Sequence, residues 1–197
     1  MTQTSQTTRS TNGLKVSFTP NQKLWYYTPA TEILCGGSFG SGKSFFLRWA
    51  SILWAMEVPG INIFLFRRTF PDLRVNHLVG PQSYLSILEP LMTSGYVKYN
   101  SAHNTFKFWN GSIITLSHLQ QEQDMYRWQG SEIHCLLLDE GTTFTEAQYR
   151  FMRSRVRMTG VKVPEKWKGH FPKIMVSSNP GGISHNFFKM GWVDMCP

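Results

Sequence analysis

The sequence predicts an α/β fold: a mostly parallel sheet flanked by helices, with an inserted β-hairpin. Strand-like apolar runs alternate with helix-like stretches, which is typical of such sheets. These runs occupy residues 31–35, 61–66, 133–138 and 174–178. The stretch GGSFGSGKS at 36–44 follows the first run and precedes a helix-like stretch. Asn110-Gly111 divides a further strand-like segment, 105–117, and predicts a type I′ hairpin turn there.

Length and composition indicate one folded domain. The chain has 197 residues, of which 41% are hydrophobic, enough to bury a core. We expect this domain to cover residues 16–190, with a disordered polar tail at 1–15 and a short linker at 191–197. The tail lacks the apolar segment of a secretory signal, and no run approaches the roughly 18 apolar residues of a membrane span. The sequence therefore predicts neither a signal peptide nor a membrane helix.

The three cysteines do not have the spacing of a metal site. Cys35 and Cys135 lie in apolar strand-like runs, and Cys196 lies near the C-terminus. We expect Cys35 and Cys135 to be buried free thiols, which favours an intracellular compartment.

The glycine-rich stretch fits the phosphate-binding pattern G-x-x-x-x-G-K-[ST] at Gly37, Gly42, Lys43 and Ser44. Glycine permits the backbone angles that turn consecutive N–H groups toward an anion. Lys43 would contact the β- and γ-phosphates of ATP, and the Ser44 hydroxyl would bind Mg²⁺. The predicted phosphate loop comprises Gly37, Ser38, Phe39, Gly40, Ser41, Gly42, Lys43 and Ser44. The alternative is a flexible glycine loop that matches by chance, but a strand-like run before it and a helix-like stretch at 44–57 both favour the phosphate site.

A second motif, CLLLDE at 135–140, places two carboxylates after four apolar residues. Buried parallel strands are apolar on both faces, and α/β sheets bind ligands at the carboxyl ends of their strands. Asp139 would hold Mg²⁺, and Glu140 would deprotonate a water that attacks the γ-phosphate. The alternative is a strand that simply ends in a polar turn.

The segment SSNP at 177–180 follows the last strand-like run. Ser178 and Asn179 are candidates for sensing the γ-phosphate from the end of that strand. Asn-Pro followed by Gly-Gly equally marks a turn.

The net charge of +8 is unevenly distributed. Between residues 145 and 175 lie eight basic side chains and only two acidic ones, Glu146 and Glu165. A basic face favours polyanions, whereas a solvated helix face is the equally good alternative.

Six segments, in this order along the chain, resemble the N-terminal ATPase domain of the large terminase of tailed bacteriophages. They are FTPNQ (18–22), GGSFGSGKS (36–44), FRRTFPDLR (66–74), RWQGSEIHCLLLDE (127–140), RFMRSRVR (150–157) and SSNPGG (177–182). The resemblance covers residues 16–190 and implies a P-loop NTPase fold of the RecA/ASCE-like type. It also implies an ATPase that uses ATP and Mg²⁺ to package viral DNA.

The resemblance implies that Phe18, Pro20 and Gln22 line the adenine pocket, because FTPNQ is similar to the family's adenine-binding motif. The planar amide of Gln22 can donate and accept at once, which suits the edge of adenine. The alternative is that this segment only begins the first helix, with Pro20 at its start. The chain departs from the family at Ser38 and Phe39, where many terminases carry a basic residue.

The family's partners are expected for this chain as well: double-stranded DNA, the portal protein, the small terminase subunit and further copies in a ring on the procapsid. The expected location is the cytoplasm of the host cell, with no membrane contact. Whole large terminases continue into a nuclease domain. Only Glu146, Glu165 and Asp194 follow Glu140 among the carboxylates, so we expect the ATPase part alone and no DNA cleavage.

Two other functions fit some of the motifs. FTPNQ, LDE and SSN also resemble motifs of helicase-type ATPases, which need a second motor domain. A nucleotide-binding switch would bind ATP without hydrolysing it, and Glu140 argues against that. We find no LSGGQ-like segment of the kind that transporter ATPases carry.

Arginines are candidates for a finger that completes the site of a neighbouring subunit. Arg127 precedes the QGSE segment and is the favoured candidate, with a salt bridge to Glu122 or Glu132 as the alternative. The second candidate is the cluster Arg150, Arg153, Arg155 and Arg157. On one helix, Tyr149, Met152 and Val156 would face the core. Arg150, Arg153 and Arg157 would lie on an adjacent face, which suits a subunit interface, a DNA contact or solvent.

Overall fold

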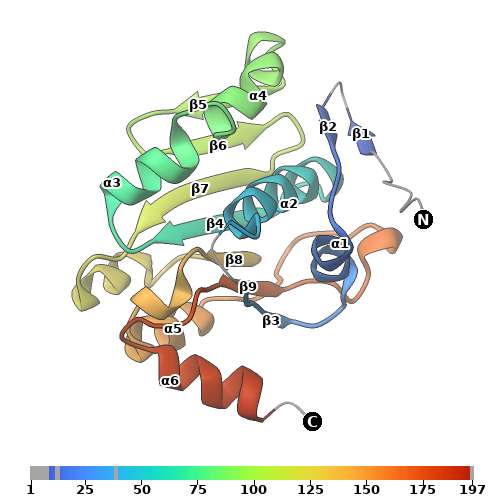
Figure 1. Ribbon diagram of the computed structural model, residues 1–197. Coiled ribbons are helices and arrows are strands. Elements are labelled where there is room, and N and C mark those ends of the chain that lie inside the picture. The colour runs from blue at the N-terminus through green and yellow to red at the C-terminus, as the bar shows by residue number, and fades with distance from the viewer. Residues whose placement is uncertain (1–8, 12–13, 38–39, 196–197) are drawn as a thin grey trace.

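The computed structural model describes residues 9–11, 14–37 and 40–195 and confirms the α/β fold with a mostly parallel sheet (Figure 1). Seven strands form the sheet in the order β3-β9-β8-β4-β7-β6-β5. Their bounds are β3 Glu32–Cys35, β4 Asn62–Arg67, β5 Val97–Asn100, β6 Thr105–Phe108, β7 Ile113–His118, β8 Cys135–Leu138 and β9 Lys173–Ser177. The five strands from β3 to β7 in this order are parallel, and β6 and β5 add to them antiparallel.

Helices cover both faces of this sheet. They are α1 Pro20–Tyr27, α2 Lys43–Glu57, α3 Phe70–Leu73, α4 Tyr84–Thr93, α5 Glu146–Arg153 and α6 His185–Phe188. Stretches of 3₁₀ and π helix occupy Arg74–Leu78, Glu122–Trp128, Gly141–Thr143, Glu165–Trp167 and Lys189–Asp194. No helix among the described residues is both long and apolar enough to cross a membrane.

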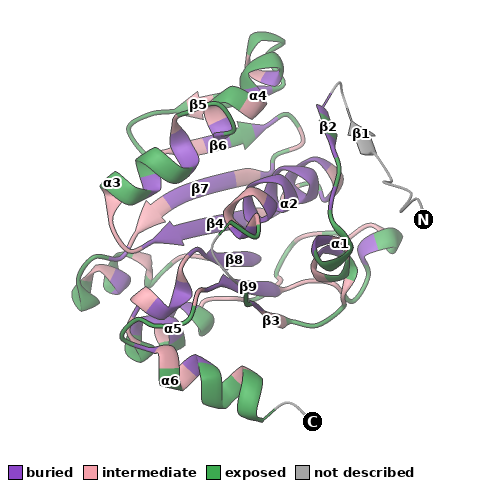
Figure 2. Cartoon of the chain, viewed as in Figure 1, coloured by how far each residue is buried: buried purple, intermediate pink, exposed green. Residues whose placement is uncertain are grey.

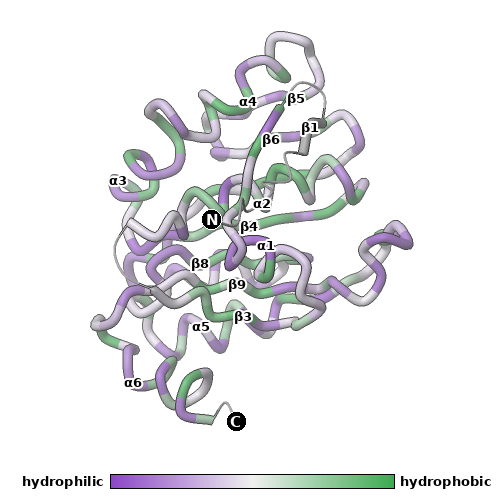
Figure 3. Tube along the Cα trace, turned by 45° about the vertical axis from the view of Figure 1, so that its right-hand side comes forward, coloured by the Kyte–Doolittle hydropathy of each residue, from purple (hydrophilic) through white to green (hydrophobic). Residues whose placement is uncertain are grey.

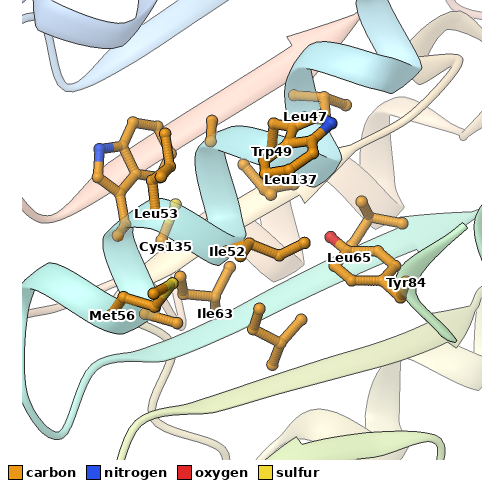
Figure 4. Packing of buried hydrophobic residues seen from close by; sticks show 14 of the residues in the cluster. Leu47, Trp49, Ile52, Leu53, Met56, Ile63, Leu65, Tyr84, Cys135 and Leu137 are labelled. Atoms are coloured by element: carbon orange, nitrogen blue, oxygen red, sulfur yellow. The ribbon is translucent and has the colours of Figure 1, made fainter. Parts of the chain in front are cut away.

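Successive residues of the central strands point to opposite faces and so build two cores. Ile63 and Leu65 of β4 belong to the cluster that α2 and α4 cover, and Figure 4 shows them packed beneath α2. Phe64 and Phe66 belong to the cluster on the other face, with Tyr149 of α5. Burial is therefore greatest in α2 and the central strands (Figure 2). Hydrophobic residues accordingly mark β4, β8 and β9 along the chain (Figure 3).

The predicted hairpin is present as β6 and β7, but its turn is not type I′. A type I′ turn needs positive φ at both central residues. Gly111 has φ 85°, whereas Asn110 is not among the residues with positive φ. The Gly111 N–H donates to the Phe108 carbonyl, and the Phe108 N–H donates to the Ser112 carbonyl. The Asn110 side chain instead donates to the Ala55 carbonyl at the end of α2, so a contact with the helix holds this turn.

Two other expectations differ from the structure. Part of the segment expected to be disordered is paired: β1, Arg9–Thr11, lies antiparallel to β2, Leu14–Val16. The expected helix over the arginine cluster ends early, because α5 stops at Arg153 and Val156 lies in an isolated bridge with Ile133. Tyr149 and Met152 face the core, as the spacing predicts.

Candidate nucleotide-binding site

The phosphate loop joins β3 to α2, and its described residues surround the Lys43 ammonium group. Gly42 has φ 74° and is the N-cap of α2, directly before Lys43. A side chain there would be strained, which explains the glycine. Lys43 Nζ donates to the Gly37 carbonyl at 3.1 Å and to Ser41 Oγ at 3.0 Å. Burial lowers the pKa of Lys43, and the carboxylate of Asp139 partly offsets this. Ser38 and Phe39 lie outside the described residues.

The carboxyl ends of three neighbouring strands supply the other wall. Arg67 and Ser177 end β4 and β9, and Asp139 directly follows β8 between them. The strands are parallel and in register at this edge. Their side chains at this level therefore point to the same face.

The Asp139 carboxylate lies at the centre of this wall and is 1% exposed. Ser44 Oγ lies 3.0 Å from both of its oxygens. Ser177 Oγ donates to Oδ1 at 2.5 Å, and Arg67 Nε and His77 Nε2 reach Oδ2 at 3.0 and 2.8 Å. Burial alone would raise the pKa of Asp139, but the bond from His77 and the charge of Arg67 lower it well below its usual value. The group is therefore an anion at neutral pH.

Glu140 follows Asp139 in the chain, but its side chain is directed toward Arg67 and solvent. Its backbone is left-handed, with φ 56°, so its side chain leaves the line of the strand. Arg67 Nη2 contacts Glu140 Oε1 at 2.5 Å, and the Glu140 side chain is 45% exposed. A pocket of about 270 Å³ joins Glu140 to Asp139, Lys43 and Ser44.

These residues fit ATP with Mg²⁺. Mg²⁺ prefers oxygen ligands and usually takes only one or two carboxylates, keeping waters and substrate phosphates as its other ligands. Ser44 and Asp139 supply a hydroxyl and a carboxylate next to each other. Within the described residues, no group of three or more His, Cys, Asp or Glu side chains is placed to hold a metal ion.

The segment after β9 contacts Lys43, at the end of the phosphate loop. Asn179 Oδ1 accepts a hydrogen bond from Lys43 Nζ at 2.9 Å. Ser178 points away, because its hydroxyl donates to Thr142 Oγ1 or to the Asn179 carbonyl. Of the two, Asn179 therefore contacts Lys43, whereas Ser178 contacts the turn after β8.

The three residues expected to line the adenine pocket lie in three different environments. Phe18 is buried and packs against Tyr26 and Phe46 in the core. Pro20 is exposed at the first position of α1. Gln22 is buried and touches the phosphate loop, because its Nε2 donates to the Gly42 carbonyl at 3.2 Å. Its Oε1 accepts from the Thr19 N–H at 3.1 Å. Of the three, Gln22 is therefore the one that contacts the described part of the loop.

The arginine candidates lie on the surface. Arg127 is 55% exposed and pairs with Asp124 at 3.1 Å, one turn earlier, and not with Glu122 or Glu132, the partners that the alternative named. Arg150 pairs with Glu146, and Arg153 with Glu32. Lys166 pairs with Glu57 and Lys168 with Glu165, so four of the eight basic side chains in this window have carboxylate partners.

Arg67, His77 and Ser177 contact Asp139, but the sequence did not identify them as site residues. Arg67 lies in the FRRTFPDLR segment and Ser177 in SSNP. Each lies at the end of a predicted strand, and this position could have identified both as site residues. His77 belongs to the π helix Arg74–Leu78 and is fully buried. No local pattern marks it, since it reaches Asp139 through tertiary packing.

Comparison with known proteins agrees with this fold. The large terminase of a thermophilic bacteriophage has a TM-score of 0.65 and 23% identity, over 90% of this chain and 42% of that chain. The large terminase ATPase domain of Thermus phage P74-26 has a TM-score of 0.56 and 15% identity, covering 89% and 71%. The N-terminal domain of the DNA packaging ATPase from bacteriophage phi29 has a TM-score of 0.55 and 14% identity, covering 88% and 86%.

These identities are low, so the likenesses show the fold alone, and the chain spans less than half of the thermophilic phage's terminase. No curated protein sequence matches this chain. The family profile described as "Terminase large subunit, T4likevirus-type, N-terminal" matches residues 34–163. That match covers more than half of the chain, which therefore belongs to the terminase large subunit family, in its N-terminal part.

Proposed function

We propose that this chain is the ATP-hydrolysing motor part of a phage large terminase, and that Mg²⁺-dependent hydrolysis drives double-stranded DNA into the procapsid. One observation carries the proposal most directly. Ser44 of the phosphate loop lies 3.0 Å from both oxygens of Asp139, which forms a site for the Mg²⁺ of a bound nucleotide. The thermophilic phage's terminase has been solved with ATP-γ-S and with ADP, which supports nucleotide binding here.

Each residue has a distinct task in the proposed reaction. Lys43 would bind the β- and γ-phosphate oxygens, and Ser44 and Asp139 would hold a Mg²⁺ ion, whose charge would stabilise the negative charge on the phosphates. A water oxygen bonds to the γ-phosphorus as the bond to the β–γ bridging oxygen breaks. Glu140 takes the proton from that water. Because Arg67 holds Glu140 Oε1 at 2.5 Å, the base acts with its other oxygen or after this ion pair opens.

Phosphate release and nucleotide binding, measured on the same proteins, test this proposal. We expect Lys43→Ala to weaken ATP binding, because it removes a ground-state phosphate contact. Glu140→Gln should still bind ATP but lose turnover by about 10²–10⁴-fold, the usual contribution of a general base. Glu146→Gln is the matched control, since Glu146 is an exposed carboxylate paired with Arg150. Near-normal turnover in Glu140→Gln would contradict the assignment of the base.

A nucleotide switch that binds without hydrolysing is the second candidate, favoured by the ion pair between Arg67 and Glu140. No phosphate release from a protein that binds ATP, in the presence of its partners, would support it. A helicase-like ATPase instead predicts stimulation by nucleic acid without any procapsid.

The partners are part of the proposal. They are double-stranded DNA, the portal protein, the small terminase subunit and further copies in a ring on the procapsid, in the host cytoplasm. Phosphate release measured with and without portal-bearing procapsids tests them. A packaging motor is expected to be slow alone and faster on its assembly, and an unchanged rate would count against it.

We also propose that this chain does not cleave DNA. Two-metal nucleases need clustered carboxylates. Here Glu146 pairs with Arg150, Glu165 with Lys168 and Asp194 with Lys189. Supercoiled plasmid incubated with Mg²⁺ or Mn²⁺ should stay intact, and nicking by purified protein would contradict this.

A further inference from the structure

Behind the proposed Mg²⁺ site, three side chains form a buried chain of hydrogen bonds. Arg48 Nη1 lies 3.3 Å from His77 Nδ1, and His77 Nε2 lies 2.8 Å from Asp139 Oδ2. All three residues are buried, His77 completely. Arg48 Nη1 also donates to the Asn76 carbonyl at 2.6 Å, which fixes the guanidinium beside the ring.

The direction of these bonds follows from the chemistry of arginine. A guanidinium has only donors, so His77 Nδ1 must accept from Arg48. In a neutral imidazole the other nitrogen then carries the proton, so Nε2–H donates to Asp139 Oδ2. Arg48 thereby sets the tautomer in which His77 is a donor to the carboxylate.

The position of Arg48 ties this chain of bonds to the phosphate loop. Arg48 lies on α2 one turn after Ser44. The same helix therefore supplies Ser44, which contacts Asp139 directly, and Arg48, which reaches Asp139 through His77. His77 comes from the π helix Arg74–Leu78, which packs against α2. Two contacts of the Asp139 carboxylate, those from Ser44 and His77, therefore depend on the position of α2.

We propose that His77 is a positioning residue, which holds the Asp139 carboxylate in the orientation that binds Mg²⁺ together with Ser44, and that Arg48 fixes the required tautomer. This inference rests on the proposed function of the same site. Outer partners of metal ligands orient those ligands, and their loss usually lowers metal affinity by about 10–100-fold.

Two amide variants of His77 test the hydrogen bonds of its two ring nitrogens separately. Glutamine places an N–H₂ donor near the position of Nε2, so His77→Gln keeps the bond to Asp139. Asparagine reaches only the position of Nδ1, so His77→Asn keeps the acceptor for Arg48 and loses the donor to Asp139. His134→Asn is the matched control, because His134 is also buried but lies before β8, where its Nδ1 accepts from the Asn62 N–H.

The measurement is binding of a fluorescent ATP analogue, titrated with Mg²⁺ and repeated in EDTA, with thermal unfolding of each variant as a check on folding. We expect His77→Asn to need about 10–100-fold more Mg²⁺ than wild type, with binding in EDTA unchanged. His77→Gln and His134→Asn should stay near wild type. Equal Mg²⁺ requirements in wild type and a folded His77→Asn would overturn the inference. A wild type that binds nucleotide without any Mg²⁺ dependence would overturn the proposed function as well.

A second readout is made on the unaltered protein, and a variant is needed only to assign one signal. Nitrogen-15 NMR distinguishes a protonated from an unprotonated ring nitrogen, and the His77 signal is assigned by its loss in His77→Gln. We expect Nε2 to carry the proton and Nδ1 to be free of it. The opposite tautomer, or a doubly protonated ring at neutral pH, would overturn the proposed role of Arg48.

Discussion

Gln22 uses both ends of its side-chain amide inside the protein. Its Oε1 completes a capping box with Thr19 at the start of α1, and its Nε2 reaches the Gly42 carbonyl. The amide therefore links the first helix to the phosphate loop. This structural task does not exclude contact with a base, since an amide has a second N–H and a second lone pair.

We predict that Gln22→Ala lowers the free energy of unfolding by about 1–2 kcal/mol, because two hydrogen bonds are lost. Chemical denaturation measures this, with Gln123→Ala as the control for an exposed glutamine on a short helix. The adenine-reading role predicts in addition that affinity for ATP falls relative to GTP. Equal losses of affinity for ATP and GTP would mean that Gln22 has only its structural contacts, the capping box and the bond to Gly42.

Cys35 and Cys135 should be chemically inert in the folded protein. Both side chains are fully buried, and burial raises the pKa of each thiol to about 12. Because the thiolate is the reactive species, we expect neither to be alkylated by iodoacetamide at pH 8, and both to react in guanidinium chloride. Peptide mass spectrometry locates the label. Labelling of either residue in native protein would show that its thiol is not buried.

At the scale of elements, Gly182 shows how closely the segment after β9 approaches the turn after β8. It has φ 92°, and a Cβ built on it would lie 2.5 Å from the Thr142 carbonyl oxygen. The Ser184 N–H also donates to this carbonyl. Contact between these two segments keeps Asn179 near Lys43.

We predict that Gly182→Ala lowers the free energy of unfolding by about 2–4 kcal/mol, from the left-handed backbone and the steric conflict together. Gly130→Ala is the control, because Gly130 has no strained φ and no atom within 4 Å of its added Cβ. Thermal or denaturant unfolding measures both. A loss no larger than that of Gly130→Ala would contradict the close approach.

The elements that the sequence predicted well are those with strong local signals. The apolar runs before Gly36 and Asp139 are strands, and the stretch after Gly42 is a helix. The errors arose where distant contacts decide the local structure. The hairpin turn follows the bond from Asn110 to the end of α2, and α5 ends at Arg153 because the next residues pair with Ile133.

At the scale of the whole molecule, some residues of the site can be identified from sequence motifs, whereas others can be identified only from the order and packing of the strands and helices. Lys43, Ser44 and Asp139 have fixed spacing or strand context, so sequence suffices to propose them. Arg67 reaches Asp139 only because β4 and β8 are neighbours in register, and strand order is not encoded locally. His77 has still less local signal, since its position depends on how its π helix packs against α2.

In the proposed ring, Arg127 is predicted to act in trans, as an arginine finger that completes the ATP site of a neighbouring subunit. Arg127 is 55% exposed, and its ion pair is to Asp124 in the same short helix. Such a surface pair holds an arginine only weakly, so the side chain is available to a neighbouring subunit. We predict that Arg127→Ala lowers turnover in the assembled ring by roughly 10³–10⁵-fold, the contribution of a finger to phosphoryl transfer. The isolated chain should be affected much less.

Mixing two inactive proteins separates a finger in trans from a purely structural ion pair. Glu140→Gln protein still offers an intact Arg127, and Arg127→Ala protein still offers an intact Asp139 and Glu140. A subunit of the second kind beside one of the first therefore has both halves of a working site, so mixed rings should recover part of the phosphate release. Asp124→Asn is the control, because it breaks the ion pair but keeps the arginine, and it should stay active. If mixed rings assemble normally and remain inactive, Arg127 does not act in trans, and Arg150, Arg153, Arg155 and Arg157 become the residues to test next.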